Sequence, residues 1–210
     1  MNIIEKLKWR YATKKFDETA ILDESKINIL KEAFNLTATS YGLQPIKLIF
    51  VQDKALQKEL VVHSMDQEQV AQASHILVFC IETIIDKAYV ETYFKRIKTI
   101  RNTPDDILEP FKDFLIDDFE ERTKAHIEDW ATKQAYLAMG NLLTVCAVEG
   151  IDSCPMEGFS PEDYDRILDL KSEGLSSVLV MPIGIRADDD MFADFKKVRK
   201  KVNESTADYQ

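Results

Sequence analysis

The sequence has no long apolar run. Its longest stretch without a charged residue, 134–148, covers about 15 residues and includes Gln134, Gly140 and Asn141, whereas a membrane-spanning helix needs about 20 apolar residues. We therefore expect a buried helix there and no membrane partner. The opening segment MNIIEKLKWR is charged from Glu5 onward and lacks the apolar core of a secretory signal. These absences predict a cytoplasmic protein.

Glycine, cysteine and histidine are also scarce. With six glycines the chain contains no GxGxxG, Walker A, HExxH or GxSxG motif, which disfavours a Rossmann dinucleotide fold. The three cysteines form an odd set, and we expect structural roles for them. The three histidines lie far apart and outside metal-ligand spacing, so the sequence predicts no metal site.

The chain lacks an excess of positive charge. Its formal net charge is -10, which repels polyanions and argues against nucleic acid as a partner. The acidic clusters at 117–121 and 188–190 lack the spaced oxygen ligands and the glycine turn of a calcium loop. We interpret them as a solvated helix face and a solvated loop.

The pattern of apolar residues predicts a mainly helical chain with a few strands. Helices are expected at residues 2–9, 23–38, 55–62, 87–100, 107–123, 127–149 and after Ser160. Strands are expected at 48–51, 76–81 and 178–185. The continuous run ILVFCI at 76–81 indicates a central strand covered on both faces, and Pro182 favours an edge position or a bulge in the third strand. No linker or repeat interrupts residues 1–210, so we predict one domain.

Two basic clusters bracket this acidic chain. Arg10 and Lys14 lie four positions apart just after a short helix, and residues 196–201 read KKVRKK. The planar fork of arginine matches phosphate oxygens. Each cluster alone is typical of a solvated surface, but a bound phosphate would explain both.

A series of motifs in the same order resembles the nitroreductase family. They are RYATKKFD (10–17), TSYGLQP (39–45), ASH before the strand ILVFC (73–80), the helix with Trp130, Gln134, Tyr136, Leu137, Gly140 and Asn141, PMEGF (155–159), and KVR (197–199). The chain looks most similar to the oxygen-insensitive NAD(P)H nitroreductase and dihydropteridine reductase branch. This resemblance implies an α+β fold, a three-layer α/β/α sandwich with a mixed, mostly antiparallel sheet and a long buried central helix. It also implies a homodimer with tightly bound FMN at the subunit interface and NAD(P)H as co-substrate.

The resemblance assigns cofactor contacts residue by residue. Arg10, Lys197 and Arg199 would hold the FMN phosphate, the backbone at Tyr11 and Ala12 would line the ribityl chain, and Lys14 would reach the pyrimidine side of the ring. The remaining contacts would come from Thr39, Ser40, Tyr41 and Gly42 of the second subunit, from Gln44 of the first, and from Pro155, Met156, Glu157 and Gly158 beside the flavin N5, with the Glu157 amide pointing toward it.

Two positions depart from that branch. Ala12 stands where a serine is common, which removes a side-chain hydroxyl contact. Gln69 stands where a lysine is frequent; its amide can hydrogen-bond O2 or N3 of the flavin but carries no charge. We therefore expect a lower flavin midpoint potential than in a lysine-bearing relative.

The resemblance further implies a ping-pong transfer of hydride from NAD(P)H to a nitroaromatic, a quinone or a similar small acceptor, with no essential side-chain nucleophile or general base. Residues 107–119, with Phe111, Phe114 and Phe119, either cover the pocket or pack their aromatic side into the protein. A flavin reductase, a pteridine reductase or another specialised member of the fold is an alternative, because pocket shape rather than a motif selects the acceptor. A non-catalytic flavin-binding dimer and a cofactor-free helical scaffold are the alternatives from other classes.

Overall fold

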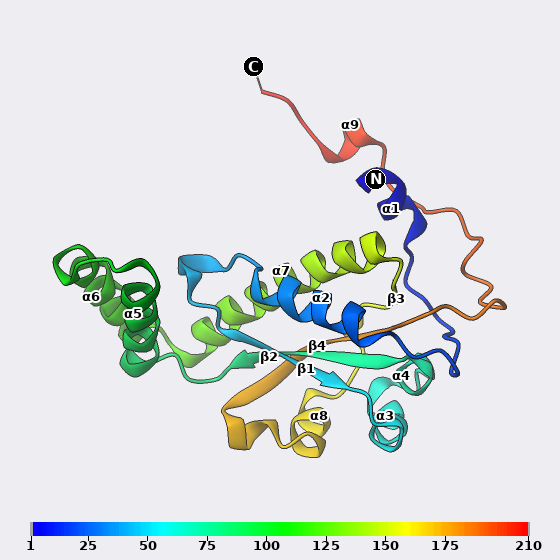
Figure 1. Cartoon of the computed structure of the whole chain (residues 1–210), viewed down its shortest axis with the longest axis horizontal. Coiled ribbons are helices and arrows are strands. Elements are labelled where there is room, and N and C mark those ends of the chain that lie inside the picture. Colours follow the sequence, from blue (N-terminus) through cyan, green and yellow to red (C-terminus); the bar gives the residue numbers. More distant parts are fainter. Residues whose placement is uncertain (1, 210) are drawn as a thin grey trace.

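A four-stranded antiparallel sheet lies at the centre of the computed structural model, which describes residues 2–209 (Figure 1). The strand order is β1-β2-β4-β3, and the strands are β1 (Ile46–Val51), β2 (His75–Glu82), β3 (Asp152–Ser153) and β4 (Leu175–Gly184). Residues 75–81 of β2 are all buried, which confirms the predicted central strand. The two-residue strand β3 was not expected, because it is too short to show a period of two.

Pro182 does not lie in an edge strand, contrary to the expectation from the sequence. It is opposite Ile76 in the ladder between β4 and β2. Its carbonyl accepts a hydrogen bond from the Cys154 amide at 3.0 Å, on the side of β4 that faces away from β2. The proline nitrogen faces that same side, so its missing N–H removes no bond to β2. The register irregularity lies elsewhere, between Phe79 and Cys80.

Helices cover both faces of the sheet. Because successive side chains of β2 point to opposite faces, alternate residues of this strand pack against different helices. Leu77 and Phe79 pack with α2 (Glu24–Asn35) and α7 (Lys124–Glu149), while Ile76 and Val78 pack with α3 (Lys54–Val61) and α8 (Pro161–Ile167). The short helices α4 (Gln69–Gln72), η2 (Val62–Ser64) and η3 (Leu170–Glu173) complete the second layer. This arrangement confirms the three-layer α/β/α fold.

The long helix α7 is buried along one face only. Thr123 caps its start by accepting a hydrogen bond from the His126 amide, and Gly150, with φ of 70°, ends it. Its buried residues are Ala131, Gln134, Ala135, Ala138, Met139, Leu142, Cys146 and Ala147. Tyr136 and Leu137, on its other face, are 46% and 52% exposed.

The ends of the molecule carry the remaining helices. At one end α5 (Lys87–Arg101) and α6 (Asp105–Glu121) form their own apolar cluster with Leu115 and Phe119, while Phe111 and Phe114 stay exposed. At the other end lie α1 (Ile3–Trp9), which has no buried residue, and an extended tail with α9 (Val202–Ser205) (Figure 1). Among residues 2–209, no helix is both long and apolar enough to span a bilayer.

Candidate functional site

Residues 10–16 run along the edge of the sheet that β3 forms. Ala12 forms a parallel bridge with Ser153, and the Thr13 amide donates to the Ser153 carbonyl at 3.3 Å. Phe16 forms an antiparallel bridge with Arg186, beyond the end of β4. Backbone pairing from two directions therefore fixes the segment that carries Arg10 and Lys14.

Arg10, Lys197 and Arg199 gather at one place although they are far apart in the sequence. The Lys197 ammonium donates to the carbonyl of Lys8 at 2.7 Å, which brings the tail against the end of α1. Burial lowers the pKa of Arg10, and the neighbouring Arg199 lowers it further. The pKa of Lys197 is lowered by burial, then by Arg10, Arg199 and Arg186. Mutual repulsion of this kind marks a site that a multivalent anion would stabilise.

The same three cations have no acidic partner among residues 2–209. The Nε atom of Arg10 is buried and makes no hydrogen bond. A buried donor without an acceptor costs about 1–3 kcal/mol, so such a group is normally satisfied by a ligand or by water. The arrangement fits a phosphate group, in a chain that is acidic as a whole.

A second set of contacts continues from Lys14. Its Nζ atom lies 3.7 Å from the sulfur of Cys154, and the Nε2 atom of Gln69 lies 3.9 Å from that sulfur. Gln69 also donates to the side chain of Gln67 at 2.9 Å, and Gln67 donates to the carbonyl of Gly158 at 3.1 Å. Residues from three separate segments thus form one continuous line of polar groups.

The loop 155–158 ends that line. Met156 forms an antiparallel bridge with Val180, its amide donating to the Val180 carbonyl at 2.8 Å. The Tyr136 hydroxyl donates to the carboxylate of Glu157 at 2.7 Å. Within the described part of the chain no intramolecular hydrogen bond uses the Glu157 amide. That N–H is therefore available to a ligand.

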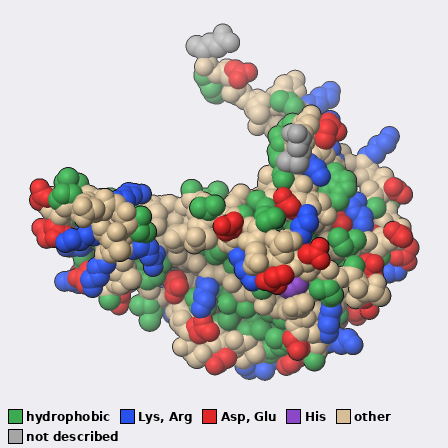
Figure 2. All heavy atoms as spheres, in the orientation of Figure 1, with side chains coloured by type: hydrophobic (Ala, Val, Ile, Leu, Met, Phe, Trp, Pro, Cys, Tyr) green, Lys and Arg blue, Asp and Glu red, His purple; other side chains and the backbone are tan. Residues whose placement is uncertain are grey.

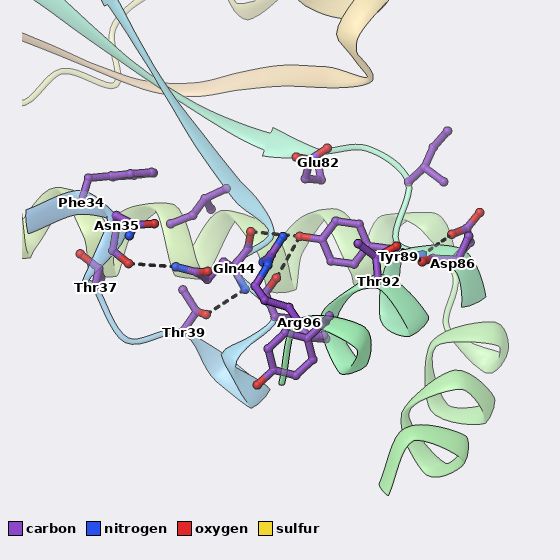
Figure 3. Close-up of a pocket in the computed structure, with 15 residues that line it drawn as sticks. Phe34, Asn35, Thr37, Thr39, Gln44, Glu82, Asp86, Tyr89, Thr92 and Arg96 are labelled. Atoms are coloured by element: carbon purple, nitrogen blue, oxygen red, sulfur yellow. Dashed lines mark hydrogen bonds between the residues drawn. The ribbon is translucent and has the colours of Figure 1, made fainter. Parts of the chain in front are cut away.

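The turn at 39–44 lies away from these groups. Thr39 and Gln44 are held together by a hydrogen bond of 3.0 Å, and the Gln44 side chain donates to the Asn35 carbonyl at 2.9 Å. Tyr89 of α5 donates to the carbonyls of Leu43 and Gln44 at the rim of a cavity of about 480 Å³ (Figure 3). Figure 1 shows this turn near the α5–α6 end of the molecule, whereas residues 10–16 lie near the opposite end.

Gln44 lies in the same turn as Thr39, Ser40, Tyr41 and Gly42. The resemblance assigned Gln44 to one subunit and the other four residues to its partner, and that assignment stays a prediction. The other predicted residues lie in the cation cluster and along the line of polar groups that continues from it, which together we call the first site. They are Arg10, Tyr11, Ala12, Lys14, Gln69, Pro155, Met156, Glu157, Gly158, Lys197 and Arg199.

Tyr41 has a backbone conformation that is unusual for an aromatic residue, with φ of 58°. Its ring packs edge-on against Phe111 and Phe119, with centroid distances of 6.3 and 6.5 Å. Gly42 follows with φ of 73°. The turn is thus strained and is held by the aromatic residues of α6.

The sequence did not reveal three residues of the first site. Cys154 and Gln67 link the predicted groups but belong to no motif that could have marked them. Asp190 belongs to a cluster that we interpreted as a solvated loop, and this is wrong: it is 5% exposed and accepts hydrogen bonds from Tyr11 and from the amides of Lys14 and Lys15. Its neighbour Asp189 is exposed, as expected.

Residues 7–185 match the Nitroreductase family. The chain belongs to the nitroreductase family. A relative from Bacillus subtilis, named as a candidate NAD(P)H nitroreductase (YfkO), is 33% identical over 181 residues, covering 82% of this chain and 80% of the relative. Membership confirms the predicted enzyme class, an oxidoreductase of the nitroreductase type.

Solved structures show the same fold at low sequence identity. The candidate nitroreductase ydfN of Bacillus subtilis superposes with a TM-score of 0.86 at 21% identity, covering 99% of this chain and 98% of that chain. A candidate nitroreductase from Exiguobacterium sibiricum, solved in complex with FMN, has a TM-score of 0.82 at 17% identity and covers 100% of this chain and 98% of that chain. These likenesses confirm the predicted nitroreductase-like fold.

Proposed function

We propose that this chain is an FMN-dependent oxidoreductase that transfers hydride from NAD(P)H to a small organic acceptor. The cluster of Arg10, Lys197 and Arg199, with the buried and unpaired Nε atom of Arg10, carries the proposal. A dianionic phosphate would supply the acceptor that the Nε atom of Arg10 lacks and the negative charge that the three cations lack. The FMN-bound neighbour of the same fold and the NAD(P)H nitroreductase names of the relatives support it.

The line of polar groups beyond the phosphate cluster suits the rest of the cofactor. The paired backbone at Tyr11 and Ala12 would border the ribityl chain, and Lys14 and Gln69 would face the pyrimidine edge of the ring. A cation at that edge favours the negative charge that the flavin gains on reduction. The free amide of Glu157 would lie beside N5. When bound, FMN would supply the hydride acceptor and donor, so the side chains only bind and orient the reactants.

The chain would act as a homodimer. Leu36, Tyr136 and Leu137 are exposed at 79%, 46% and 52% and line a shallow cavity between the end of α2 and the middle of α7. Figure 2 shows a hollow between the α5–α6 end and the end that carries α1 and the tail, and α2 and α7 form its floor in Figure 1. A second copy seated there would cover these apolar side chains.

A dimer would also unite the two separated parts of the site. The turn at 39–44 and the Arg10 cluster lie toward opposite ends of one chain, so a twofold axis through α7 would bring the turn of one subunit near the cations of the other (Figure 1). In this arrangement Gln44 would come from the same subunit as Thr39. The exposed rings of Phe111 and Phe114, stacked with an interplanar angle of 13°, would offer a flat surface to an aromatic or quinone-like acceptor.

Anaerobic reduction tests this function. Purified protein loaded with FMN is mixed with NADH or with NADPH, the loss of flavin absorbance is followed, and the reduced protein is then offered nitroaromatic, quinone, free flavin and pterin acceptors. We expect complete bleaching by at least one nicotinamide, reoxidation by at least one acceptor, and parallel double-reciprocal lines. Protein that binds FMN but is not bleached would be a non-catalytic flavin dimer, and protein that does not bind FMN would refute the proposal.

A further inference from the structure

Asp190 is a buried carboxylate that the proposed function does not use. Its side chain is in a chain segment rich in charged residues, yet it is 5% exposed. One oxygen accepts from the Tyr11 hydroxyl at 2.8 Å, from the Lys14 amide at 3.0 Å and from the Lys15 amide at 3.2 Å. The other oxygen accepts from the Phe192 amide at 3.1 Å. Four donors thus converge on one carboxylate.

These donors come from two parts of the chain, and both parts reach the cluster of Arg10, Lys197 and Arg199. Tyr11, Lys14 and Lys15 belong to the segment that begins at Arg10. Phe192 belongs to the tail that leads to Lys197 and Arg199. The two parts already run antiparallel before Asp190: the Asp17 amide donates to the Ile185 carbonyl at 2.9 Å, and the Ala187 amide donates to the Lys15 carbonyl at 3.0 Å.

Asp190 is where that pairing ends and the tail changes direction. The Asp190 amide donates to the Ala187 carbonyl at 3.1 Å, which makes a turn, and the carboxylate closes the turn onto the amides at 14 and 15. Beyond this point the tail makes local turn hydrogen bonds, from the Ala193 amide to the Asp190 carbonyl and from the Phe195 amide to the Phe192 carbonyl, before Lys197 meets the carbonyl of Lys8. The direction in which the tail leaves the turn therefore depends on Asp190.

We propose that Asp190 is a positioning residue for the cofactor phosphate: it locks the segment after Arg10 to the tail, so that Arg10, Lys197 and Arg199 form one preassembled anion site. This inference rests on the proposed FMN binding. Holding three like charges together costs free energy, which must come from neighbouring contacts when no anion is bound. The four charge-assisted hydrogen bonds of Asp190 are such contacts.

The charged form of Asp190 suits this role. Burial alone would raise its pKa, but the hydrogen bonds from the Lys14 amide, the Tyr11 hydroxyl and the Phe192 amide outweigh burial, so the pKa is lowered. An asparagine cannot replace it. With its carbonyl oxygen toward the three donors, its NH₂ group would face the Phe192 N–H, and the opposite orientation would place NH₂ against three donors.

The test compares the affinity for FMN with that for riboflavin, which has the same ring and ribityl chain but no phosphate. Apoprotein of the wild type, Asp190→Asn, Tyr11→Phe and the exposed neighbour Asp189→Asn is titrated with each flavin, using the quenching of flavin fluorescence. For Asp190→Asn we expect the affinity for FMN to fall about tenfold to a hundredfold while the affinity for riboflavin stays constant. Tyr11→Phe, which removes one donor, should show a smaller loss of the same kind.

The outcomes separate the inference from the function on which it rests. If the wild type does not prefer FMN to riboflavin, the proposed function fails. If the wild type prefers FMN and both Asp190→Asn and Tyr11→Phe keep that preference, the inference alone is overturned. An equal loss of affinity for both flavins in Asp190→Asn and Tyr11→Phe, with a lowered melting temperature, shows a structural role only and also overturns it. Asp189→Asn should bind both flavins as the wild type does.

Discussion

The ammonium group of Lys14 lies 3.7 Å from the thiol of Cys154, a buried group that cannot neutralise it. Burial raises the pKa of Cys154, although Lys14 and Gln69 lower it in part. The thiol therefore stays uncharged near neutral pH. The Cys154 thiol therefore brings no negative charge to the place beside Lys14 where the flavin ring is proposed to bind, and Gln69, in contact with the same sulfur, adds a neutral amide.

Gln69→Lys should raise the flavin midpoint potential. The new ammonium would be the second cation near the proposed pyrimidine edge, and we expect an increase of about 30 mV or more, equivalent to about 1.4 kcal/mol for a two-electron couple. Dye-equilibrated spectroscopic titration of the FMN-loaded protein measures the potential. Gln69→Met, which removes the amide without adding charge, is the control. An unchanged potential in Gln69→Lys would count against this placement of the flavin ring.

Leu137→Glu should dissociate the proposed dimer. Leu137 is 52% exposed on α7, and a carboxylate buried there between two subunits would lack a partner. Sedimentation velocity should show a dimer for the wild type and a dissociation constant raised at least about tenfold for the variant. Val62→Glu, at a residue that is 66% exposed on the opposite layer, should remain dimeric. A monomeric wild type would refute the dimer directly.

Gly42→Ala should destabilise the fold more than Gly174→Ala does. Both glycines have positive φ, of 73° and 71°, so each alanine should cost about 1 kcal/mol in strain. A Cβ at Gly42 would in addition lie 2.5 Å from the Tyr93 hydroxyl, whereas a Cβ at Gly174 would meet nothing within 4 Å. Urea unfolding measures both costs. In a Tyr93→Phe background the excess cost at Gly42 should shrink to what the remaining 3.3 Å approach to the ring carbon Cζ imposes, and an undiminished excess would show that the hydroxyl contact is not the cause.

His75 should make the fold sensitive to mild acid. It is 4% exposed, and burial lowers its pKa below the ordinary value of 6.5. Its Nδ1 atom lies within hydrogen-bond distance, 2.9 Å, of the Ser74 hydroxyl, which also accepts from the Leu22 amide.

Because the pKa of His75 is lower in the folded state, its contribution to stability is complete above about pH 6.5 and falls as the pH drops toward the folded pKa. The free energy of unfolding of the wild type should therefore decrease as the pH is lowered from about 6.5. His75→Gln should flatten that slope, and His126→Gln, at an exposed position, should keep it. An unchanged slope in His75→Gln would exclude His75 as its origin.

The sequence predicted the elements whose pattern is long enough to be unambiguous. The run from Ile76 to Ile81 lies in the buried strand β2, and the stretch from Gln134 to Val148 forms the C-terminal half of α7. The composition alone did not show that one face of this helix is exposed. The two residues of β3 could not be predicted, because their strand exists only through pairing with Gly184 and Ile183.

The site was predicted unevenly for a related reason. Arg10 and Lys14 were recognisable because a second basic cluster lies at the other end of the chain and because both residues fall in the motif RYATKKFD. Asp190 was not recognisable, since a buried carboxylate has the same letter as the exposed Asp189 beside it. Asp189 pairs with the Lys15 ammonium at the surface, whereas Asp190 is buried and accepts from backbone amides. The hydrogen bonds of Gln44 to Thr39 and Asn35 depend on how the turn at 39–44 folds, which residue spacing does not predict.

The contact between Lys197 and the carbonyl of Lys8 joins positions 189 residues apart. Arg10 is synthesised early, but the other two cations of the cluster appear only after translation has passed Arg199. During synthesis the nascent chain therefore lacks most of the charge that would hold a phosphate. Capture of the cofactor should follow release of the tail from the ribosome, and a message truncated before Lys197 would yield a sheet and helices without a phosphate site.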